Sequence, residues 1–340
     1  MMERPRGHLL VNRGLIAVLA ALFVAGSGEV SRAEDAPADP APPAYRTIYS
    51  VRDTLAESLF GKRDPSEWRP LGLSNLFTEG WNEPWLAPPR GTGGAPRQGW
   101  INATDGDFYR LAFFTYGISQ VHRPNELAQL GQFTLYTPLS RRLEVVTNLP
   151  FIQKNENLGS GQVFIGSSGA GTRRLAPGQV GTGDLSFAPR VMLIDTQDFA
   201  LIAQASVRTP TGRTSADGKT SLTPSVQFWS NPFGGFGFRG GLGVTTPLNH
   251  RADGPSLIGQ LAAGYTFTDH DVPLFGDFTA YLSGVVKVDL PDSAATTVSL
   301  TPGIRTHVGG DWYVLAAVET PVTGSRGFDS TGFFWFMKAW

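Results

Sequence analysis

Hydrophobic and polar side chains alternate along most of the chain from Asp107 to the C-terminus. Residues 199–207 and 278–288 illustrate the pattern, with apolar side chains at every second position and polar or small ones between them. A period of two is typical of β-strands that are apolar on one face only. The pattern predicts strands at residues 107–122, 127–138, 142–152, 182–194, 198–210, 219–230, 236–247, 256–268, 275–290, 296–308, 311–321 and 330–340.

The connections between these strands alternate in length. Those after the even-numbered strands are tight, whereas most of the others are longer and rich in glycine and polar residues, with 123–126 and 291–295 as short exceptions. Transmembrane β-barrels have short periplasmic turns and longer outer loops, and their tilted strands are longer than ordinary globular strands. The sequence therefore predicts an all-β fold, an antiparallel up-and-down transmembrane β-barrel of about 12 strands over residues 107–340.

The same alternation also fits a secreted β-sandwich that binds carbohydrate, in which the apolar face packs against a second sheet. Aromatic residues near the strand ends favour the barrel, because membrane barrels carry aromatic girdles at both interfaces. These residues are Phe151, Phe199, Phe236, Tyr265, Phe267, Trp312, Phe328 and Phe333. The sandwich remains the alternative.

The N-terminal residues have the pattern of an export signal. Three arginines precede the apolar run 15–25, and small residues follow it at Ser31 and Ala33. A basic region, a short apolar region and a small-residue cleavage site indicate a secretory signal peptide. We therefore expect a cleaved signal peptide at residues 1–33, a Pro/Ala-rich linker at 34–44, and an exported protein located in the outer membrane.

Residues 45–106 form a Trp-rich segment that a plain barrel does not need. Its predicted elements are a short amphipathic helix at residues 52–61 and four tryptophans, Trp68, Trp81, Trp85 and Trp100, that require burial. One hypothesis places the segment inside the lumen as a plug, and the other places it on the periplasmic rim of the barrel. The rim is favoured because barrel lumens are usually polar.

Composition excludes several classes of function. The chain has 28 Lys and Arg against 29 Asp and Glu, a net charge of −1, and no cysteine. It therefore lacks the basic surface of a nucleic-acid-binding protein and the thiols of disulfide, zinc or iron–sulfur sites. Asp269-His270-Asp271 lies in a predicted turn, where such residues are common, and no nucleophile motif accompanies His122 or His250. We expect no enzyme, no cofactor and no metal site.

The polar face of the predicted strands would line the lumen. It carries five basic and five acidic side chains together with neutral hydrogen-bonding groups, so we expect a narrow passage with little net charge selectivity. A loop over residues 153–181 would bring Arg173 and Arg174 to the mouth if it folds inward, and otherwise leave them at a solvated tip. The lumen candidates are Arg190, Arg208, Arg239, Lys287 and Arg305, with Glu144, Asp184, Asp277, Asp289 and Glu319, and the neutral Gln204, Gln227, Gln260, Tyr281 and Ser299.

Short motifs resemble a known family of outer-membrane barrels. Gly183-Asp184-Leu185, Arg190 and Pro210-Thr211-Gly212 resemble motifs of the family named the putative meta-pathway of phenol degradation. The resemblance implies a barrel that passes small organic solutes, aromatic or apolar in character. The run 94–100 is similar to Trp-rich leaders of exported barrel proteins from planctomycete-type bacteria.

The last strand, 330–340, resembles the C-terminal signal that barrel-assembly machinery recognises. The expected partners are therefore the lipid bilayer of the outer membrane, the assembly machinery and small organic solutes, with no nucleic acid. A structural or adhesive outer-membrane protein with a closed lumen is the alternative function.

Overall fold

The computed structural model of the protein describes residues 49–62, 65–120, 127–154, 181–212, 220–249, 254–290, 296–323 and 329–340. The predicted signal peptide and linker, and the loop residues Arg173 and Arg174, lie outside the described residues.

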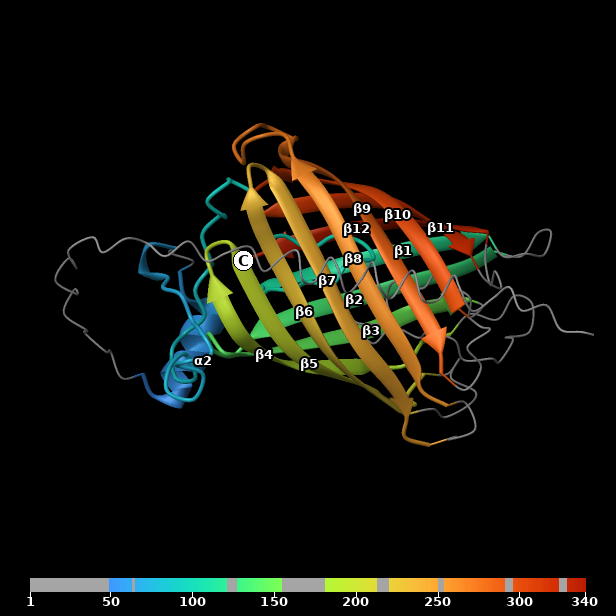
Figure 1. Ribbon diagram of the computed structural model, residues 1–340, viewed down its shortest axis with the longest axis horizontal. Helices are drawn as coiled ribbons and strands as arrows, with labels where there is room; N and C mark the ends of the chain where they lie inside the picture. The colour runs from blue at the N-terminus through green and yellow to red at the C-terminus, as the bar shows by residue number, and fades with distance from the viewer. Residues whose placement is uncertain are drawn as a thin grey trace, which may run out of the picture. The chain divides into compact units, whose positions relative to one another are not determined.

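Twelve antiparallel strands form one closed barrel, in which each strand pairs with its neighbours in sequence and β1 pairs with β12 (Figure 1). The predicted fold class is therefore confirmed. The strands are β1 Leu111–Gln120, β2 Leu127–Pro138, β3 Leu143–Lys154, β4 Ser186–Thr196, β5 Phe199–Arg208, β6 Ser221–Phe233, β7 Phe236–Pro247, β8 Ser256–Thr266, β9 Gly276–Asp289, β10 Thr296–Gly309, β11 Trp312–Thr323 and β12 Ser330–Ala339.

The first predicted strand starts too early. It was expected from residue 107, but β1 begins at Leu111, because the backbone N–H groups of residues 107–109 donate to Asp105, Asp107 and Glu144 and not to the backbone of a neighbouring strand. The backbone N–H of Tyr109, for example, donates to the Glu144 carboxylate at 2.6 Å. The alternating pattern does continue into these residues, but they do not join the sheet.

Alternating side chains separate the two faces of the barrel wall. Phe113 and Phe333 are buried inside, whereas their neighbours Phe114 and Phe334 are 49% and 47% exposed on the outside. Among the described residues all strands belong to this one sheet, so the predicted sandwich alternative is wrong. A closed barrel with an exposed apolar exterior is the arrangement found in transmembrane barrels. The exterior includes Tyr116, Ile118, Val226, Leu242, Leu282, Ile304, Val318 and Phe336.

Aromatic rings gather at the end of the barrel that carries the short turns. Phe236 packs edge-on against Tyr265, and Tyr265 packs in the same way against Phe267, with centroids 4.8 and 4.9 Å apart. This band agrees with the predicted girdle at these three positions. Phe333 does not belong to it, because its side chain is on the inward row of β12 and is 4% exposed. Phe328 lies outside the described residues.

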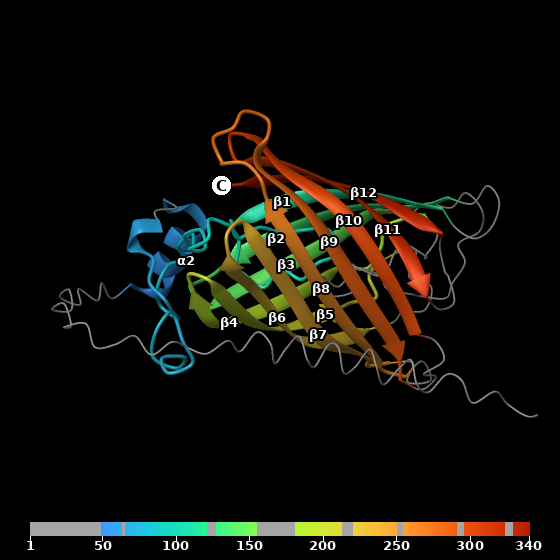
Figure 2. The same cartoon turned by 45° about the horizontal axis from the view of Figure 1, so that its top comes forward.

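A short helix and an extended segment lie at the same end of the barrel as the turns and the C-terminus (Figure 2). The helix α2, Val51–Phe60, is capped by the Ser50 side chain, which accepts a hydrogen bond from Asp53 N. Its buried residues are Thr54 and Ser58. The single turn η2, Pro65–Glu67, follows. No helix of the described part of the chain is long and apolar enough to cross a membrane.

Candidate functional site

A loop that precedes β1 fills part of the barrel interior. We call residues 97–109 the inner loop; every residue from Gln98 to Leu111 is buried. The loop enters the barrel at the end that carries the short turns, which we call the turn end. It reverses near Asn102 and returns to the same end, where β1 begins. Its tip contacts Ser283 and Thr301, which lie near the middle of β9 and β10. The inner loop therefore occupies the turn half of the lumen.

The backbone reverses at Asn102, which has a φ of 55°. Asparagine tolerates this left-handed conformation better than most residues. Ala103 N–H donates to the Trp100 carbonyl, which closes the turn. Gly106 then lets the chain pass against the wall, since a Cβ there would lie 2.1 Å from the backbone carbonyl carbon of Phe228. Local turn chemistry and one glycine thus shape the inner loop.

Wall side chains satisfy polar groups of the inner loop at its tip. The Tyr281 hydroxyl accepts from Ile101 N at 3.1 Å, and the Ser283 hydroxyl donates to the Ile101 carbonyl at 3.2 Å. Asn102 Nδ2 donates to Thr301 Oγ1 at 2.9 Å. Buried backbone groups without such partners would be costly, so these contacts help to hold the inner loop in place.

Trp100 lies in a slot that the wall provides. Its ring stacks on Tyr281, with centroids 5.3 Å apart and an interplanar angle of 4°. Gly237 and Gly264 face each other across β7 and β8 at the edge of the indole. A Cβ at Gly264 would lie 2.8 Å from the Trp100 ring, and one at Gly237 would lie 3.2 Å away. The two glycines therefore leave the space that the indole occupies.

Asp105 is held by groups from two different strands. Its Oδ1 accepts from Arg239 Nη1 of β7 at 3.2 Å, and its Oδ2 accepts from the Tyr136 hydroxyl of β2. Arg239 also donates to the Thr104 carbonyl at 3.0 Å and to the Tyr109 hydroxyl. The same guanidinium lies 5.3 Å from the centre of the Trp100 ring. Arg239 thus contacts the charged and the aromatic part of the inner loop together.

Arg97 links both ends of the inner loop to the end of β4. Its Nη1 lies 2.6 Å from Asp195 Oδ1 and 3.2 Å from Asp107 Oδ1, and its side chain is buried. Burial and the nearby Asp195 charge raise the pKa of Asp107 to about 6, against the opposing effect of Arg97. Burial also raises the pKa of the Tyr109 hydroxyl.

The upstream segment contacts the turns at this end of the barrel, and we call residues 49–62 and 65–96 the rim segment. Arg142, in the β2–β3 turn, donates to the carbonyls of Gly72 and Glu79 at 3.0 and 3.1 Å. Asp198, in the β4–β5 turn, accepts from Thr92 N at 2.6 Å. The plug and rim hypotheses were posed as alternatives, but the Trp-rich segment divides between them. Residues up to 96 contact the rim, and the inner loop enters the barrel.

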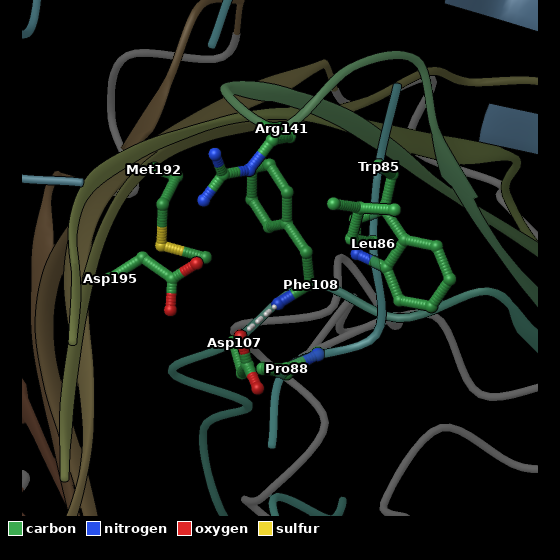
Figure 3. A pocket seen from close by; sticks show the side chains of 8 residues that line it. All are labelled: Trp85, Leu86, Pro88, Asp107, Phe108, Arg141, Met192 and Asp195. Atoms are coloured by element: carbon green, nitrogen blue, oxygen red, sulfur yellow. Dashed lines mark hydrogen bonds between the residues drawn. The ribbon is translucent and has the colours of Figure 1, made fainter. Parts of the chain in front are cut away.

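A small pocket lies where the rim segment, the inner loop and the wall meet (Figure 3). Trp85 comes from the rim segment, Asp107 and Phe108 from the inner loop, and Met192 and Asp195 from β4. Phe108 N donates to Asp107 Oδ1 at 2.8 Å, which orients this carboxylate at the edge of the pocket.

The predicted lumen residues fall mainly on the buried face, and several of them pair within the wall. Glu144 pairs with Arg190, Asp184 accepts from Arg208 at 2.7 Å, and Lys287 lies 3.3 Å from Asp289. Glu319 accepts from Ser299 at 2.6 Å, and Asp277 pairs with Arg90 of the rim segment. Those that are buried are Glu144, Asp184, Arg190, Gln204, Gln227, Arg239, Gln260, Asp277, Tyr281, Ser299, Arg305 and Glu319.

Arg239 and Arg305 differ from the other buried arginines, because both donate to the inner loop. Arg305 donates to the Gln98 side chain and lies 4.2 Å from the Tyr313 ring. The sequence analysis missed Asp105, and it identified Trp100 only as a tryptophan that requires burial. The cluster of Asn, Asp and Gly at 102–107, at the start of the alternating region, was the available signal for a turn.

His270 interacts with side chains of β9 and β10. Its Nδ1 lies 2.7 Å from Asp277 Oδ2, and its ring stacks on His307 with centroids 4.1 Å apart. Within the described ranges, no three His, Asp or Glu side chains form a group that could hold a metal ion.

Residues 132–337 match the family described as "Putative MetA-pathway of phenol degradation". The chain belongs to this family. The family match begins within β2, so it covers most of the wall but not the inner loop. No curated protein sequence matches the chain at a significant level.

Solved outer-membrane barrels resemble this fold at low sequence identity. A COG4313 outer membrane channel from Pseudomonas putida F1 is 11% identical with a TM-score of 0.47, over 68% of this chain and 94% of that one. A KdgM porin is 8% identical with a TM-score of 0.44, over 68% of this chain and 99% of that one. The corresponding values for OccK11 (OpdR) of Pseudomonas aeruginosa are 10%, 0.32, 69% and 98%.

Proposed function

We propose that this protein is an outer-membrane channel for small organic solutes, and that the inner loop closes it in the described conformation. The apolar exterior and the aromatic band support a place in a bilayer. Membership of the phenol-degradation family supports a solute that is small and organic, aromatic or apolar. The turn end, with the rim segment, would face the periplasm.

The observation that carries the proposal is the burial of residues 98–111 inside a barrel of twelve strands. Barrels of this size lie between side-chain-filled eight-stranded barrels and the wide porins. A lumen of that width leaves little room beside a loop that contacts β2, β3, β7, β9 and β10. Passage of a solute therefore requires the inner loop to move.

The contacts of the inner loop are of a kind that water can replace. Most are hydrogen bonds and ion pairs, whose net contribution to stability is modest because water offers alternative partners. Five buried polar atoms of the inner loop have no hydrogen-bond partner in the described part of the chain: Arg97 Nε, Trp100 Nε1, Asn102 Oδ1, Thr104 Oγ1 and Asp107 Oδ2. Displacement would return these atoms to water, which lowers the free energy of opening.

An engineered disulfide tests whether the inner loop is the gate. The natural chain has no cysteine, so a pair introduced at Thr104 and Gly241 can form only one bridge. A Cβ at Gly241 would lie 2.7 Å from Thr104 Cγ2, which is close enough for a disulfide. The variant carrying Thr104→Cys and Gly241→Cys should show no conductance in a planar bilayer when oxidised, and discrete conductance steps after reduction.

The matched control is the single Thr104→Cys variant, which should conduct equally with and without reductant. Conductance of the oxidised double variant at the reduced level would show that the inner loop is not the gate. Absence of conductance from the wild-type protein and from the reduced variant would instead favour a structural protein with a permanently closed lumen. Heat-dependent gel mobility confirms that each variant forms a barrel.

We further propose that residues 1–33 are cleaved during export and that barrel-assembly machinery recognises β12. The outward side chains Phe334 and Phe336 of this strand would enter the bilayer first. Substitution of both by Ser should lower the amount of folded barrel in the outer membrane without changing export.

A further inference from the structure

The wall groups around the inner loop include an arginine whose partners all come from that loop. Among the described residues, Arg239 donates to the Thr104 carbonyl, the Asp105 carboxylate and the Tyr109 hydroxyl. Its side chain is fully buried. When the inner loop leaves, Arg239 remains on the wall without the carboxylate that neutralises it. A wall cation without a counter-ion then faces a narrow lumen, so this position attracts an anion.

The shape of the position specifies which kind of anion. The carboxylate of Asp105 lies between Arg239 of β7 and the Tyr136 hydroxyl of β2, so one oxygen meets a cation and the other meets a neutral donor. This donor set matches a carboxylate that presents two oxygens to opposite sides of the lumen.

A flat aromatic ring fits next to this carboxylate position. The slot of Trp100 is bounded by the Tyr281 face and by the two opposed glycines, Gly237 and Gly264, whose lack of side chains makes room for a ring. Arg239 contacts both Trp100 and Asp105: its guanidinium lies 5.3 Å from the indole centroid, and its Nη1 lies 3.2 Å from Asp105 Oδ1. A ring and a carboxylate that share one guanidinium could therefore belong to one small molecule.

We propose that this surface binds small aromatic carboxylates, and that the inner loop occupies their site in the closed channel. We name it the acid site: Arg239, Tyr136, Tyr281 and the slot at Gly237 and Gly264. The proposal rests on the channel function above and specifies its substrate class and its opening signal. Solute binding to the acid site excludes Asp105 and Trp100 and so shifts the population toward the open state.

A second wall arginine supports the preference for anions. Arg305 donates to the Gln98 side chain of the inner loop, and its nearest aromatic contact is Tyr313 at 4.2 Å. It is close enough to Arg239 for the two charges to repel each other. Displacement of the inner loop removes the Asp105 carboxylate and the neutral Gln98 side chain. Arg305 keeps the nearby charge of Asp277 of the wall, whereas Arg239 loses its carboxylate, so the surface favours a negatively charged solute over a neutral one.

The test uses benzoate as the probe in planar bilayers containing the mature wild-type protein. Benzoate should raise the open probability at least tenfold at a concentration where benzamide, which has the same ring and no charge, changes it less than twofold. Cyclohexanecarboxylate, which has the charge but no flat ring, should lie between the two. Equal responses to benzoate and benzamide would overturn the proposal.

Substitution of the wall arginine provides the second arm. Arg239→Gln should abolish the benzoate response, whatever its basal open probability. The matched control is Arg208→Gln, because Arg208 also comes from the inner face but pairs with Asp184, just before β4. That variant should keep the response of the wild type. Loss of the response in both variants, or in neither, contradicts the acid site.

Competition between benzoate and the inner loop distinguishes the acid site from the proposal that the inner loop is the gate. Asp105→Asn weakens the inner loop as a competitor, so benzoate should act at a concentration at least fivefold lower than in the wild type. If the reduced cysteine variant conducts but no variant responds to benzoate, the acid site is wrong and the gate stands. If the reduced variant fails to conduct, the proposed channel function fails first.

Discussion

The barrel wall and the inner loop are consecutive in sequence, yet they are stabilised in different ways. Residues of the wall bond to one another through regular backbone ladders, as in the ten residue pairs that join β1 to β12. The inner loop has no such ladder: a turn hydrogen bond between Ala103 and Trp100 closes its tip, and wall side chains such as Tyr281 and Ser283 hold that tip in place.

This difference separates the stability of the fold from the position of the inner loop. Backbone hydrogen bonds between strands form whatever the side chain, except at proline. We therefore expect single substitutions on the inner face to leave the twelve-stranded barrel intact. The contacts of the inner loop each depend on one side chain of matching shape or charge. Substitutions in this interface should therefore change gating strongly while the barrel keeps its heat-resistant mobility.

The largest effect is expected from Trp100→Ala, which empties the slot between Tyr281 and the two glycines. Removal of a buried tryptophan costs about 3–5 kcal/mol, and here the loss falls on the closed conformation. The open probability should rise by more than about 100-fold while gel mobility shows an intact barrel. Trp81→Ala, at a partly exposed tryptophan of the rim segment, serves as the control and should change neither quantity. Unfolding of the Trp100 variant would contradict the separation of wall and inner loop.

A smaller effect should follow from filling the same slot from the wall side. In Gly264→Ala, the new methyl group would lie 2.8 Å from the Trp100 ring. Overpacking of this kind costs about 1–3 kcal/mol, which corresponds to about 5- to 150-fold more opening. Gly259→Ala on the same strand is the matched control, because its Cβ meets only Leu242, at 3.7 Å. A larger response from Gly259→Ala than from Gly264→Ala would show that the slot does not hold Trp100 in place.

The sequence alone predicts the wall almost completely, because a strand with one apolar face imposes a period of two on its own residues. Strand β7 occupies exactly the predicted range 236–247, and β9 lies within one residue of its predicted ends. Loop lengths and the apolar exterior then follow from the membrane setting. These signals are local, so they are visible without knowledge of what lies across the lumen.

The inner loop could not be placed in the same way, because its position is determined by residues distant in sequence. Asp105 meets Arg239 and Tyr136, which are 134 and 31 positions away along the chain. Nothing in the sequence next to any of these three residues indicates that they meet. The preference for the rim rested on the apolar character of the segment, but the glycines at 237 and 264 give the indole a place that a polar lumen would otherwise lack.

The pH dependence of opening tests how the inner loop is anchored. In the closed state the pKa of Asp107 is raised to about 6 by burial, whereas its ordinary value is 3.8. The closed state therefore binds the proton more tightly, and lowering the pH from 7 to 5 should favour closure by about tenfold, or about 1.4 kcal/mol.

Asp107→Asn isolates the contribution of this carboxyl group, which faces Arg97, Asp195 and Arg239. The about tenfold change in open probability between pH 7 and pH 5 that Asp107 causes in the wild type should be absent from this variant. An unchanged pH dependence, or a wild-type channel that opens as the pH falls, would show that Asp107 is solvated in the closed state.

The smallest effect is expected from an exposed ion pair of the rim segment, Arg69 with Glu83 at 2.7 Å. The Arg69 side chain is 47% exposed, and such pairs contribute about 0–1 kcal/mol. Arg69→Gln should therefore change the open probability less than about fivefold, and less again at high salt.

The comparison is Arg97→Gln, at the buried arginine between Asp107 and Asp195. Breaking a buried pair leaves uncompensated charges and costs about 3–5 kcal/mol, so this variant should open more than about 100-fold. If Arg69→Gln opened the channel as strongly as Arg97→Gln, closure would depend on the rim segment as a whole. The inner loop would then be only the buried end of a larger moving body. That body would start at residue 49 and not at residue 97, so the rim segment would belong with the inner loop and not with the wall.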